Sequence, residues 1–424
     1  MRIRWSLIFA FLALLAACMP AVAEVYAINY AGGAVAVDKT GAVLIPAGKY
    51  DELYALFDDN GSHTGYAAGL YKGDSIMYAV LDSTGRALTE HIYSEVRQAG
   101  NGCIVCENGA YKYLNSAHMY DDMEFSDMAY SGDGRVLAVV GNIYDDIGDT
   151  VTILWPDGIY FQTGIRILGG LGRFSEGLMP VYDSETRLYG YINNQGSWVI
   201  SPAFKYAGDF SEGLAVIAGD DGYGVIDRSG TIKLAPSSPR FTRTDTMFAM
   251  IRSGSLRVYD GELTPKSVTA LADGSARISG NYIILYSGDD VSVMRMDGEK
   301  LFSANSEAQI SSVGAELFAV RQGKWMDECV SLVASDGSAI SDGYVDLYAL
   351  GNSGIAYAAL TENSDLSYGL MDQNGIRLTE ALYSSMAYVA DGLYIAYSPT
   401  GAVLLDREGN ILNTFKSDRL PPVD

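Results

Sequence analysis

The side chains best suited to chemistry are few in this chain, which has four cysteines and three histidines among 424 residues. Cys103 and Cys106 have the Cys-x-x-Cys spacing of redox and metal sites. They lie in an apolar, strand-like segment, where residues three apart face opposite sides at roughly 10 Å, beyond disulfide reach. A zinc site needs two more ligands, and no second pair follows. With Cys329 the number is odd, so we expect inert, mostly buried thiols, with a redox or metal role as the alternative.

The histidines belong to no recognisable motif. His63, His91 and His118 are far apart, and none has a metal-ligand spacing. The chain contains no Gly-x-Ser-x-Gly elbow and no phosphate-binding loop. A Ser-His-Asp triad is defined by geometry, so residue order alone does not exclude one. We expect the three histidines to be structural or merely exposed.

The carboxylates leave one enzymatic alternative open. With 52 acidic residues, a pair at the separation that a glycosidase needs would arise by chance, and the sequence singles out none. No acidic cluster follows a calcium-loop pattern, so we interpret the clusters as solvated turns. These clusters are Asp58-Asp59, Asp121-Asp122, Asp145-Asp146, Asp220-Asp221 and Asp289-Asp290. The sequence therefore predicts no catalytic, cofactor-binding or metal-binding residue, and no cofactor.

Composition indicates a globular β-rich protein. Apolar residues make up 48% of the chain, and the 47 glycines and 30 tyrosines suit tight turns and half-buried strands. The net charge of −23 argues against nucleic acid and anionic membrane surfaces as partners. Tyrosine also suits carbohydrate or peptide binding. We favour core packing for most tyrosines, because they occupy equivalent strand positions.

The N-terminus resembles a signal peptide. Arg2 and Arg4 precede an apolar run at 7–17, which is too short to span a bilayer, and Ala21-Val22-Ala23 forms a cleavage site before Glu24. Removing residues 1–23 would leave a charge of −25, because both arginines go and no acid does. Leu15-Ala16-Ala17-Cys18 resembles a lipobox, so lipidation of Cys18 is the alternative to plain secretion. An ordinary buried helix is the least favoured interpretation, and no later segment is apolar enough to cross a membrane.

Internal repetition is the clearest pattern in the chain. Phe-Ser-Glu-Gly-Leu begins at Phe174 and again at Phe210, and Tyr-Gly occurs at Tyr189 and Tyr223. A weaker marker, an apolar run followed by Asp-x-x-Gly or Asp-Gly, recurs about every 37 residues. Its eleven positions are Asp38–Gly41, Asp82–Gly85, Asn115, Asp157-Gly158, Asn193–Gly196, Asp227–Gly230, Asp260-Gly261, Asp297-Gly298, Asp336-Gly337, Asp372–Gly375 and Asp406–Gly409.

Each marker predicts a turn between two short strands. Asp or Asn opens the turn by binding its own backbone, and Gly takes the left-handed position. Pro or Glu before an aromatic residue, as in Pro202-Ala203-Phe204, suits a strand end. Such a unit cannot bury its apolar face alone, so neighbouring units must stack.

These units resemble WG repeats, a bacterial family of β-rich repeats. Residues 173–230 carry the resemblance most specifically and residues 368–383 moderately, through Tyr368-Gly369-Leu370-Met371-Asp372 and Gly375. Tyr-Gly stands in place of the family's Trp-Gly, which preserves an aromatic ring against a glycine. The resemblance implies binding and surface display more than defined chemistry, and it implies no catalytic residue.

The sequence predicts an all-β fold of tandem three- to four-stranded antiparallel repeats in a β-propeller-like array, with an open β-solenoid or superhelix as the alternative. The predicted parts are a signal peptide at 1–23, repeat halves at 24–235 and 236–412, and a polar tail at 413–424. The turn-forming stretch Leu234 to Arg243 suggests the middle boundary.

We expect an exported, secreted or cell-surface scaffold without catalytic activity. Its predicted partner is a protein, peptide or glycan, and a lipid anchor is the alternative mode of attachment. An exported glycoside hydrolase with paired carboxylates is the alternative function.

Overall fold

The computed structural model describes residues 25–416, except 31, 115–123, 140–148, 156–159, 239, 244–246, 253–254, 271–274, 315, 324–328, 352, 362–364 and 391. The predicted signal peptide, Cys18, His118 and the repeat markers at Asn115 and Asp157-Gly158 lie outside the described residues. The same holds for the acidic pairs Asp121-Asp122 and Asp145-Asp146. No helix in the described ranges is long and apolar enough to cross a membrane.

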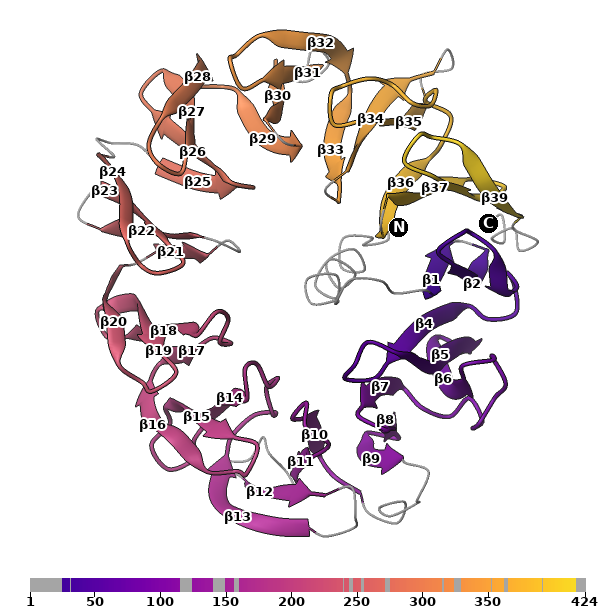
Figure 1. Cartoon of the computed structure of the whole chain (residues 1–424), viewed down its shortest axis with the longest axis vertical. Helices are drawn as coiled ribbons and strands as arrows, with labels where there is room; N and C mark the ends of the chain where they lie inside the picture. The colour runs from indigo at the N-terminus through magenta and orange to yellow at the C-terminus, as the bar shows by residue number, and fades with distance from the viewer. Residues whose placement is uncertain are drawn as a thin grey trace. The chain divides into compact units, whose positions relative to one another are not determined.

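The described residues form eleven small antiparallel sheets, and within each sheet the strands pair in chain order (Figure 1). The first sheets are β1 (Val25–Tyr30), β2 (Gly33–Asp38), β3 (Val43–Ile45); β4 (Glu52–Phe57), β5 (His63–Lys72), β6 (Ser75–Asp82); β7 (Glu95–Ala99), β8 (Gly102–Glu107), β9 (Ala110–Leu114); and β10 (Asp127–Tyr130), β11 (Val136–Val139), β12 (Asp149–Leu154), β13 (Tyr160–Ile167). The next are β14 (Leu178–Tyr182), β15 (Tyr189–Asn193), β16 (Trp198–Phe204); β17 (Tyr206–Ala207), β18 (Leu214–Gly219), β19 (Gly222–Asp227), β20 (Ile232–Ser238); and β21 (Arg240–Arg243), β22 (Met247–Arg252), β23 (Ser255–Asp260), β24 (Pro265–Ala270). The last are β25 (Ser275–Ser279), β26 (Tyr282–Ser287), β27 (Asp290–Arg295), β28 (Lys300–Asn305); β29 (Gln309–Gly314), β30 (Leu317–Gln322), β31 (Cys329–Ala334), β32 (Ala339–Tyr344); β33 (Asp346–Leu350), β34 (Gly354–Leu360), β35 (Leu366–Met371); and β36 (Ser385–Ala390), β37 (Leu393–Ser398), β38 (Gly401–Leu405), β39 (Ile411–Lys416).

This architecture confirms the predicted all-β, β-propeller-like array of three- and four-stranded repeats. The chain divides into two compact units, one comprising Met1–Val136, Trp155–Ile159 and Lys416–Asp424 and the other Leu137–Leu154 and Tyr160–Phe415. Two predicted boundaries are wrong. The division between residues 235 and 236 falls inside β20, and residues 413–416 of the predicted tail belong to β39, where Phe415 is buried.

The repeat marker forms the same turn in most sheets. At Asp227, Oδ1 accepts the backbone N–H groups of Ser229 (2.9 Å) and Thr231 (3.1 Å), and Gly230 has a φ of +85°. This is a three-residue hairpin loop with a left-handed residue before the next strand. The same bonds form at Asp38, Asp82, Asn193, Asp260, Asp372 and Asp406.

Three markers differ in detail from the prediction. After Asp260 the left-handed position is Leu263 (φ +63°), not Gly261. Gly298 and Gly337 do take the left-handed position, but their turns open at Arg295 and Ala334. The fold therefore tolerates a different opening residue, provided that the residue three positions later adopts positive φ.

A steric constraint explains why glycine follows tyrosine in the Tyr-Gly dipeptide. A Cβ on Gly224 would lie 2.6 Å from the carbonyl oxygen of Leu234 and 2.7 Å from the nitrogen of Pro236, so no larger residue fits. A Cβ on Gly190 would lie equally close to the carbonyl oxygen of Ile200 and to the nitrogen of Pro202. In each pair the register shifts at this point, and the bulge in the edge strand accommodates a proline, which donates no hydrogen bond.

Phe-Ser-Glu-Gly-Leu connects one repeat to the next. Ser175 and Leu178 exchange backbone hydrogen bonds around Glu176 (φ +52°) and Gly177 (φ +77°), which is a type I′ turn. The Glu176 carboxylate accepts the N–H of Gly213 in the following copy, at 3.0 and 3.2 Å from its two oxygens. The motif is therefore a turn whose carboxylate binds the backbone of the next turn.

The cores lie between sheets, as the stacking argument requires. One cluster unites Leu178, Tyr191 and Ile200 of one sheet with Phe210 and Ile226 at the next. Tyr191 and Phe210 meet edge to face, with ring centroids 4.8 Å apart. Middle strands are covered on both faces and edge strands are not, so each repeat depends on its neighbour for burial.

Polar side chains also connect the first strands of neighbouring sheets. Arg97 donates to the Met128 carbonyl at 3.3 Å, Arg277 donates to the Ile310 carbonyl, and Tyr348 donates to the Met386 carbonyl at 3.0 Å. Each donor directly follows the second residue of its strand, and each acceptor is the second residue of the next sheet's first strand. These bonds satisfy carbonyl groups that lack a sheet partner on that side.

Candidate functional site

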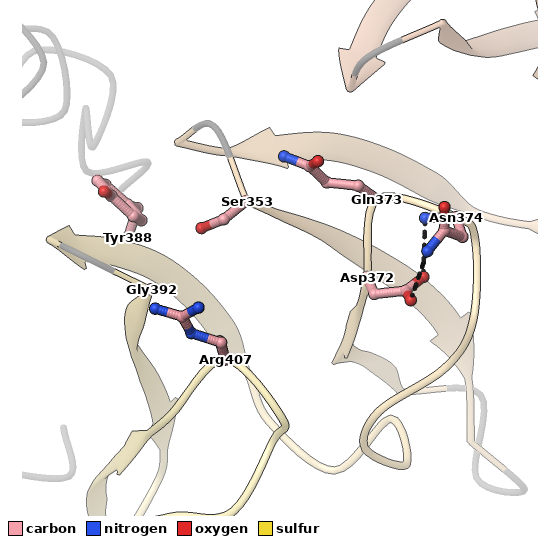
Figure 2. Close-up of a pocket in the computed structure, with 7 residues that line it drawn as sticks. All are labelled: Ser353, Asp372, Gln373, Asn374, Tyr388, Gly392 and Arg407. Carbon is pink, nitrogen blue, oxygen red and sulfur yellow. Dashed lines mark hydrogen bonds between the residues drawn. The ribbon is translucent and has the colours of Figure 1, made fainter.

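A pocket opens between the last two sheets, β33–β35 and β36–β39, inside the second unit. Its volume is about 480 Å³. It is lined by Ser353, Asp372, Gln373, Asn374, Tyr388, Gly392 and Arg407 (Figure 2). Most of these residues come from turns, so the pocket is a product of the repeat geometry. Its size lies within the roughly 300–1,000 Å³ that is typical of small-molecule sites.

The marker turn after β35 sets one wall of the pocket. Asp372 Oδ1 accepts the N–H groups of Asn374 (2.9 Å) and Ile376 (2.8 Å), and Oδ2 accepts the Asn374 side-chain amide at 3.2 Å. Figure 2 shows Asp372 and Asn374 turned toward each other and Gln373 extending away from them. The carboxylate is thus used to hold the turn, and the turn presents the Gln373 amide.

An aromatic ring forms the opposite wall. Tyr388 of β36 is 36% exposed and meets Tyr394 edge to face, with ring centroids 6.0 Å apart. A Cβ on Gly351 would lie 2.7 Å from the Tyr388 ring, so the ring lies directly against a backbone with no side chain. The Ser353 hydroxyl is hydrogen-bonded to the Tyr394 hydroxyl at 2.7 Å, and burial raises the pKa of Tyr394. These contacts restrict the rotation of Tyr388.

Arg407 supplies the positive charge of the pocket. It follows Asp406 in the turn between β38 and β39, and a Cβ on Gly392 would lie 3.2 Å from the Arg407 Cβ. The side chain therefore extends across a glycine, and its guanidinium points toward Ser353 and Tyr388 (Figure 2). Within the described part of the chain this guanidinium has no hydrogen bond or ion pair.

Arg228 occupies the equivalent position in an earlier repeat, but its guanidinium is hydrogen-bonded. Arg228 follows Asp227 as Arg407 follows Asp406, yet its guanidinium donates to the Glu176 carbonyl at 2.7 Å. The same position in the turn therefore holds a bonded arginine in one repeat and an unbonded one in another. This contrast identifies Arg407 as a group available to a ligand.

The arrangement favours binding over chemistry. Hydrolysis of a glycosidic bond by general acid–base catalysis needs two available carboxyl groups about 5–10 Å apart. Within the described ranges Asp372 is the one carboxylate that lines this pocket, and it already accepts three hydrogen bonds. What remains for a ligand is a cation, an amide, a hydroxyl and an aromatic ring.

The cysteines singled out by sequence do not meet the pocket. Cys103 and Cys106 lie on β8, both buried and both free, because β8 is covered on its two faces. Burial raises the pKa of the Cys103 thiol to about 11. Cys329 at the start of β31 is exposed and free. None of these three cysteines forms a disulfide in the structure.

Neither of the two described histidines, His63 and His91, lines the pocket. His63 is the first residue of β5 and packs edge to face on Tyr66, with ring centroids 4.5 Å apart. The ring centroids of His91 and Tyr50 lie 5.8 Å apart. Burial lowers the pKa of both imidazoles. In the ranges that the structure describes, no group of three His, Cys, Asp or Glu side chains could hold a metal ion.

The three acidic pairs that the structure describes lie in turns and at the surface. Asp58 Oδ1 accepts the N–H groups of Asn60 and Ser62, both at 2.9 Å, so this residue opens a turn of the marker type. Asp220 forms an exposed ion pair with Lys205. Asp289-Asp290 lies at the turn between β26 and β27. These positions agree with the interpretation as solvated turns.

Sequence reasoning did not find the pocket. Asp372 and Gly392 appear in the sequence only as members of the repeat, and Tyr388 and Arg407 belong to no motif. A usable signal was present: an arginine directly follows the marker aspartate at two places, 228 and 407. Whether such an arginine is bonded depends on the neighbouring turn, which spacing alone does not reveal.

Comparison with known proteins supports the repeat assignment. Residues 189–218 match the WG containing repeat. This segment holds the Tyr-Gly dipeptide, the marker turn and the Phe-Ser-Glu-Gly-Leu motif, so the predicted resemblance is confirmed there. No curated protein matches the chain.

Several solved structures are similar to the chain. BamB from Moraxella catarrhalis is 15% identical, with a TM-score of 0.28, over 62% of this chain and 93% of that one. Hsv2p from Kluyveromyces lactis is 9% identical, with a TM-score of 0.30, over 56% and 94%. PorZ, a bacterial surface component of the type-IX secretion system of Porphyromonas gingivalis, is 10% identical, with a TM-score of 0.23, over 92% and 72%. We draw no functional conclusion from these values.

Proposed function

We propose that this WG-repeat protein is a non-catalytic scaffold that binds a peptide or glycan through the pocket between its last two sheets. One observation carries the proposal: the pocket combines the exposed Tyr388 ring with the Arg407 guanidinium, which is unbonded among the described residues. Aromatic surface gives a ligand contact area at low entropic cost, and an unpaired guanidinium gives directional hydrogen bonds. In other repeats, aromatic rings and arginines contact the protein itself, as in the edge-to-face contact of Tyr191 with Phe210 and the hydrogen bond from Arg228 to the Glu176 carbonyl.

The hydrolase alternative receives less support. Among the described residues Asp372 supplies the pocket's carboxylate, and its two oxygens accept hydrogen bonds from the backbone and side-chain amides that hold the turn. An acid that is needed to hold a turn is poorly placed to exchange protons with a substrate. Among the residues that the structure describes, no second carboxylate lines the pocket to complete a pair.

Export is the second part of the proposal. It is supported by the basic and apolar N-terminal residues and by the small-residue site at Ala21-Val22-Ala23. Expression of the full chain in a bacterial host, followed by mass measurement of the released protein, tests it. A mature chain that begins at Glu24 supports secretion, and a diacylated chain that begins at Cys18 supports lipidation. A chain that keeps Met1 in the cytoplasm contradicts export.

Binding is tested with arrays of peptides and glycans probed by the full chain and by a Tyr388→Ala variant. We expect one class of ligand to bind the native chain and to lose at least tenfold in affinity with the variant. Tyr71→Ala, an exposed tyrosine of β5 outside the pocket, is the matched control and should keep full binding. Ligands that bind both variants equally would place the binding surface elsewhere and reject the pocket.

A further inference from the structure

We infer, resting on the proposed function, that the pocket takes a short carbohydrate with a carboxylate, a uronic acid unit of one or two rings. The inference starts from the contrast between two equivalent arginines. Arg228 is held by a carbonyl of the neighbouring turn, whereas Arg407 extends over Gly392 and ends in the pocket. A planar guanidinium in an open pocket fits a carboxylate through two parallel hydrogen bonds.

The polarity of the walls favours a sugar over a peptide. None of the seven lining residues is aliphatic: they are one serine, one aspartate, one glutamine, one asparagine, one tyrosine, one glycine and one arginine. Peptide grooves specify their ligands with pockets for side chains, which are mostly apolar. A sugar presents hydroxyl groups at its rim, and the Gln373 amide offers both a donor and an acceptor for them.

Tyr388 provides an apolar surface that suits one face of a sugar ring. A pyranose ring has an apolar face of C–H groups, and an exposed aromatic ring is a suitable surface for that face. Gly351 lies against the Tyr388 ring, and Tyr394 meets that ring in an edge-to-face arrangement, so the ring is already positioned before a ligand arrives. Positioning in advance reduces the entropic cost of binding.

Net charge restricts the length of the ligand. The chain carries a charge of −23, so a long polyanion would be repelled outside the pocket. At physiological salt the Debye length is about 8 Å, so a single carboxylate at Arg407 is screened from acidic residues outside the pocket and is exposed to the charges of Arg407 and Asp372 alone among the lining residues. A mono- or disaccharide therefore satisfies both conditions, and a polyuronate does not.

The test measures binding of two matched disaccharides to the full chain by calorimetry. Digalacturonate and α-1,4-galactobiose share linkage and ring configuration, and they differ only at C6, which is a carboxylate in the first and a hydroxymethyl group in the second. Matched pairs with glucose and mannose configuration extend the panel. We expect at least one uronate to bind tenfold or more tightly than its neutral counterpart, because charge-assisted hydrogen bonds exceed neutral ones.

Two arginine variants assign the effect. Arg407→Ala should weaken uronate binding by about 10- to 100-fold and leave binding of the neutral sugar nearly unchanged. Arg228→Ala removes an arginine at the equivalent position that lies outside the pocket, and it should bind the uronate like the native chain. Circular dichroism of both variants confirms that they are folded.

The outcomes separate this inference from the proposed function. If neutral sugars or peptides bind, depend on Tyr388 and ignore Arg407, the uronate inference is wrong and the scaffold function stands. If the uronate binds equally well to the native chain and to Arg407→Ala, the inference is also wrong. If nothing on the arrays or in the panel depends on Tyr388, the pocket has no binding role and both proposals fall.

Discussion

The Phe-Ser-Glu-Gly-Leu motif allows a direct measurement of the coupling between repeats. Its second glutamate position resembles the first: Glu212 has a φ of +51° and Glu176 a φ of +52°. A left-handed conformation costs a residue with a Cβ roughly 1–2 kcal/mol, and asparagine or glycine avoids much of that cost. The two glutamates differ in one respect. Glu176 binds the Gly213 N–H, and the Glu212 carboxylate has no hydrogen bond to the described residues.

Replacing each glutamate with asparagine should therefore have different results. Glu212→Asn relieves the backbone and loses no bond, so we expect it to stabilise its turn by about 1 kcal/mol. Glu176→Asn gains the same amount but loses a hydrogen bond from an N–H to a carboxylate, worth about 1 kcal/mol at an exposed site. Its net effect should be close to zero. The difference between the two variants estimates the bond between repeats.

Hydrogen exchange is the appropriate assay, because stability in a repeat array is a sum of local terms and a single unfolding midpoint averages over them. We expect the amide of Gly213 to exchange about fivefold faster in Glu176→Asn and more slowly in Glu212→Asn. Glu176→Gln keeps an acceptor oxygen at the same reach and loses only the charge, so the Gly213 amide should exchange at a rate between those of the native chain and Glu176→Asn.

Equal protection in the two asparagine variants would refute the reasoning, because it would mean that the Glu176 carboxylate contributes nothing. A Glu212→Asn variant no more stable than the native turn would refute the other half, because positive φ would then carry no measurable cost at this position. Either result would leave the turn geometry unchanged and would remove its role in connecting repeats.

Three further predictions concern pH, thiols and the bonds between first strands. Burial raises the pKa of Tyr54 to about 12, and the nearby Glu52 carboxylate adds to this shift. The stability that depends on the neutral phenol is therefore complete below pH 10 and falls as the pH rises toward 12. Absorbance at 295 nm and unfolding at both pH values measure this, and a Tyr54 phenolate that forms near pH 10 in the folded chain would contradict it. Alkylation followed by mass spectrometry should modify the exposed Cys329 in the folded chain and Cys103 only after unfolding, and equal rates would show that Cys103 is accessible. Tyr348→Phe should cost about 1 kcal/mol, because it removes the bond between first strands, and the Met386 amide should exchange faster; unchanged protection there would show that this bond is dispensable.

The repeats were predictable because their signals are local. An aspartate that binds N–H groups two and four residues later and a glycine at positive φ specify a turn within five residues. Such a turn needs no information from the rest of the chain. The markers at Asp38, Asp82, Asp227 and Asp406 therefore predicted the observed geometry without help from tertiary contacts.

The errors arose where a neighbouring strand decides the outcome. The prolines near residue 236 suggested a boundary, yet Pro236 sits in edge strand β20, where Gly224 leaves room for it and no donor is needed. The polar C-terminal segment suggested a tail, but its first residues form the end of β39, a strand of the last sheet, where Phe415 is only 4% exposed. Residue composition does not show whether a partner strand is available.

The pocket was unpredictable for a related reason. Its walls come from turns of two repeats, and Asp372 and Arg407 are separated by 35 positions. Each turn could be inferred from its own residues. The distance between the turns depends on how two sheets stack, and stacking is set by core side chains such as Tyr394 and Leu405 that belong to neither turn.

The repeat also suggests where binding specificity can arise. In the marker turns at Asp227, Asp372 and Asp406 the aspartate and the left-handed residue hold the backbone, and the residue directly after the aspartate is not needed for either task. That position holds Arg228, Gln373 and Arg407 in three different repeats. A substitution there should change stability by less than about 0.5 kcal/mol when its side chain is unbonded, since it removes no structural contact. Gln373 and Arg407 both line the pocket, so variation at this one position of a repeat can alter a ligand site while the turns that build the site remain intact.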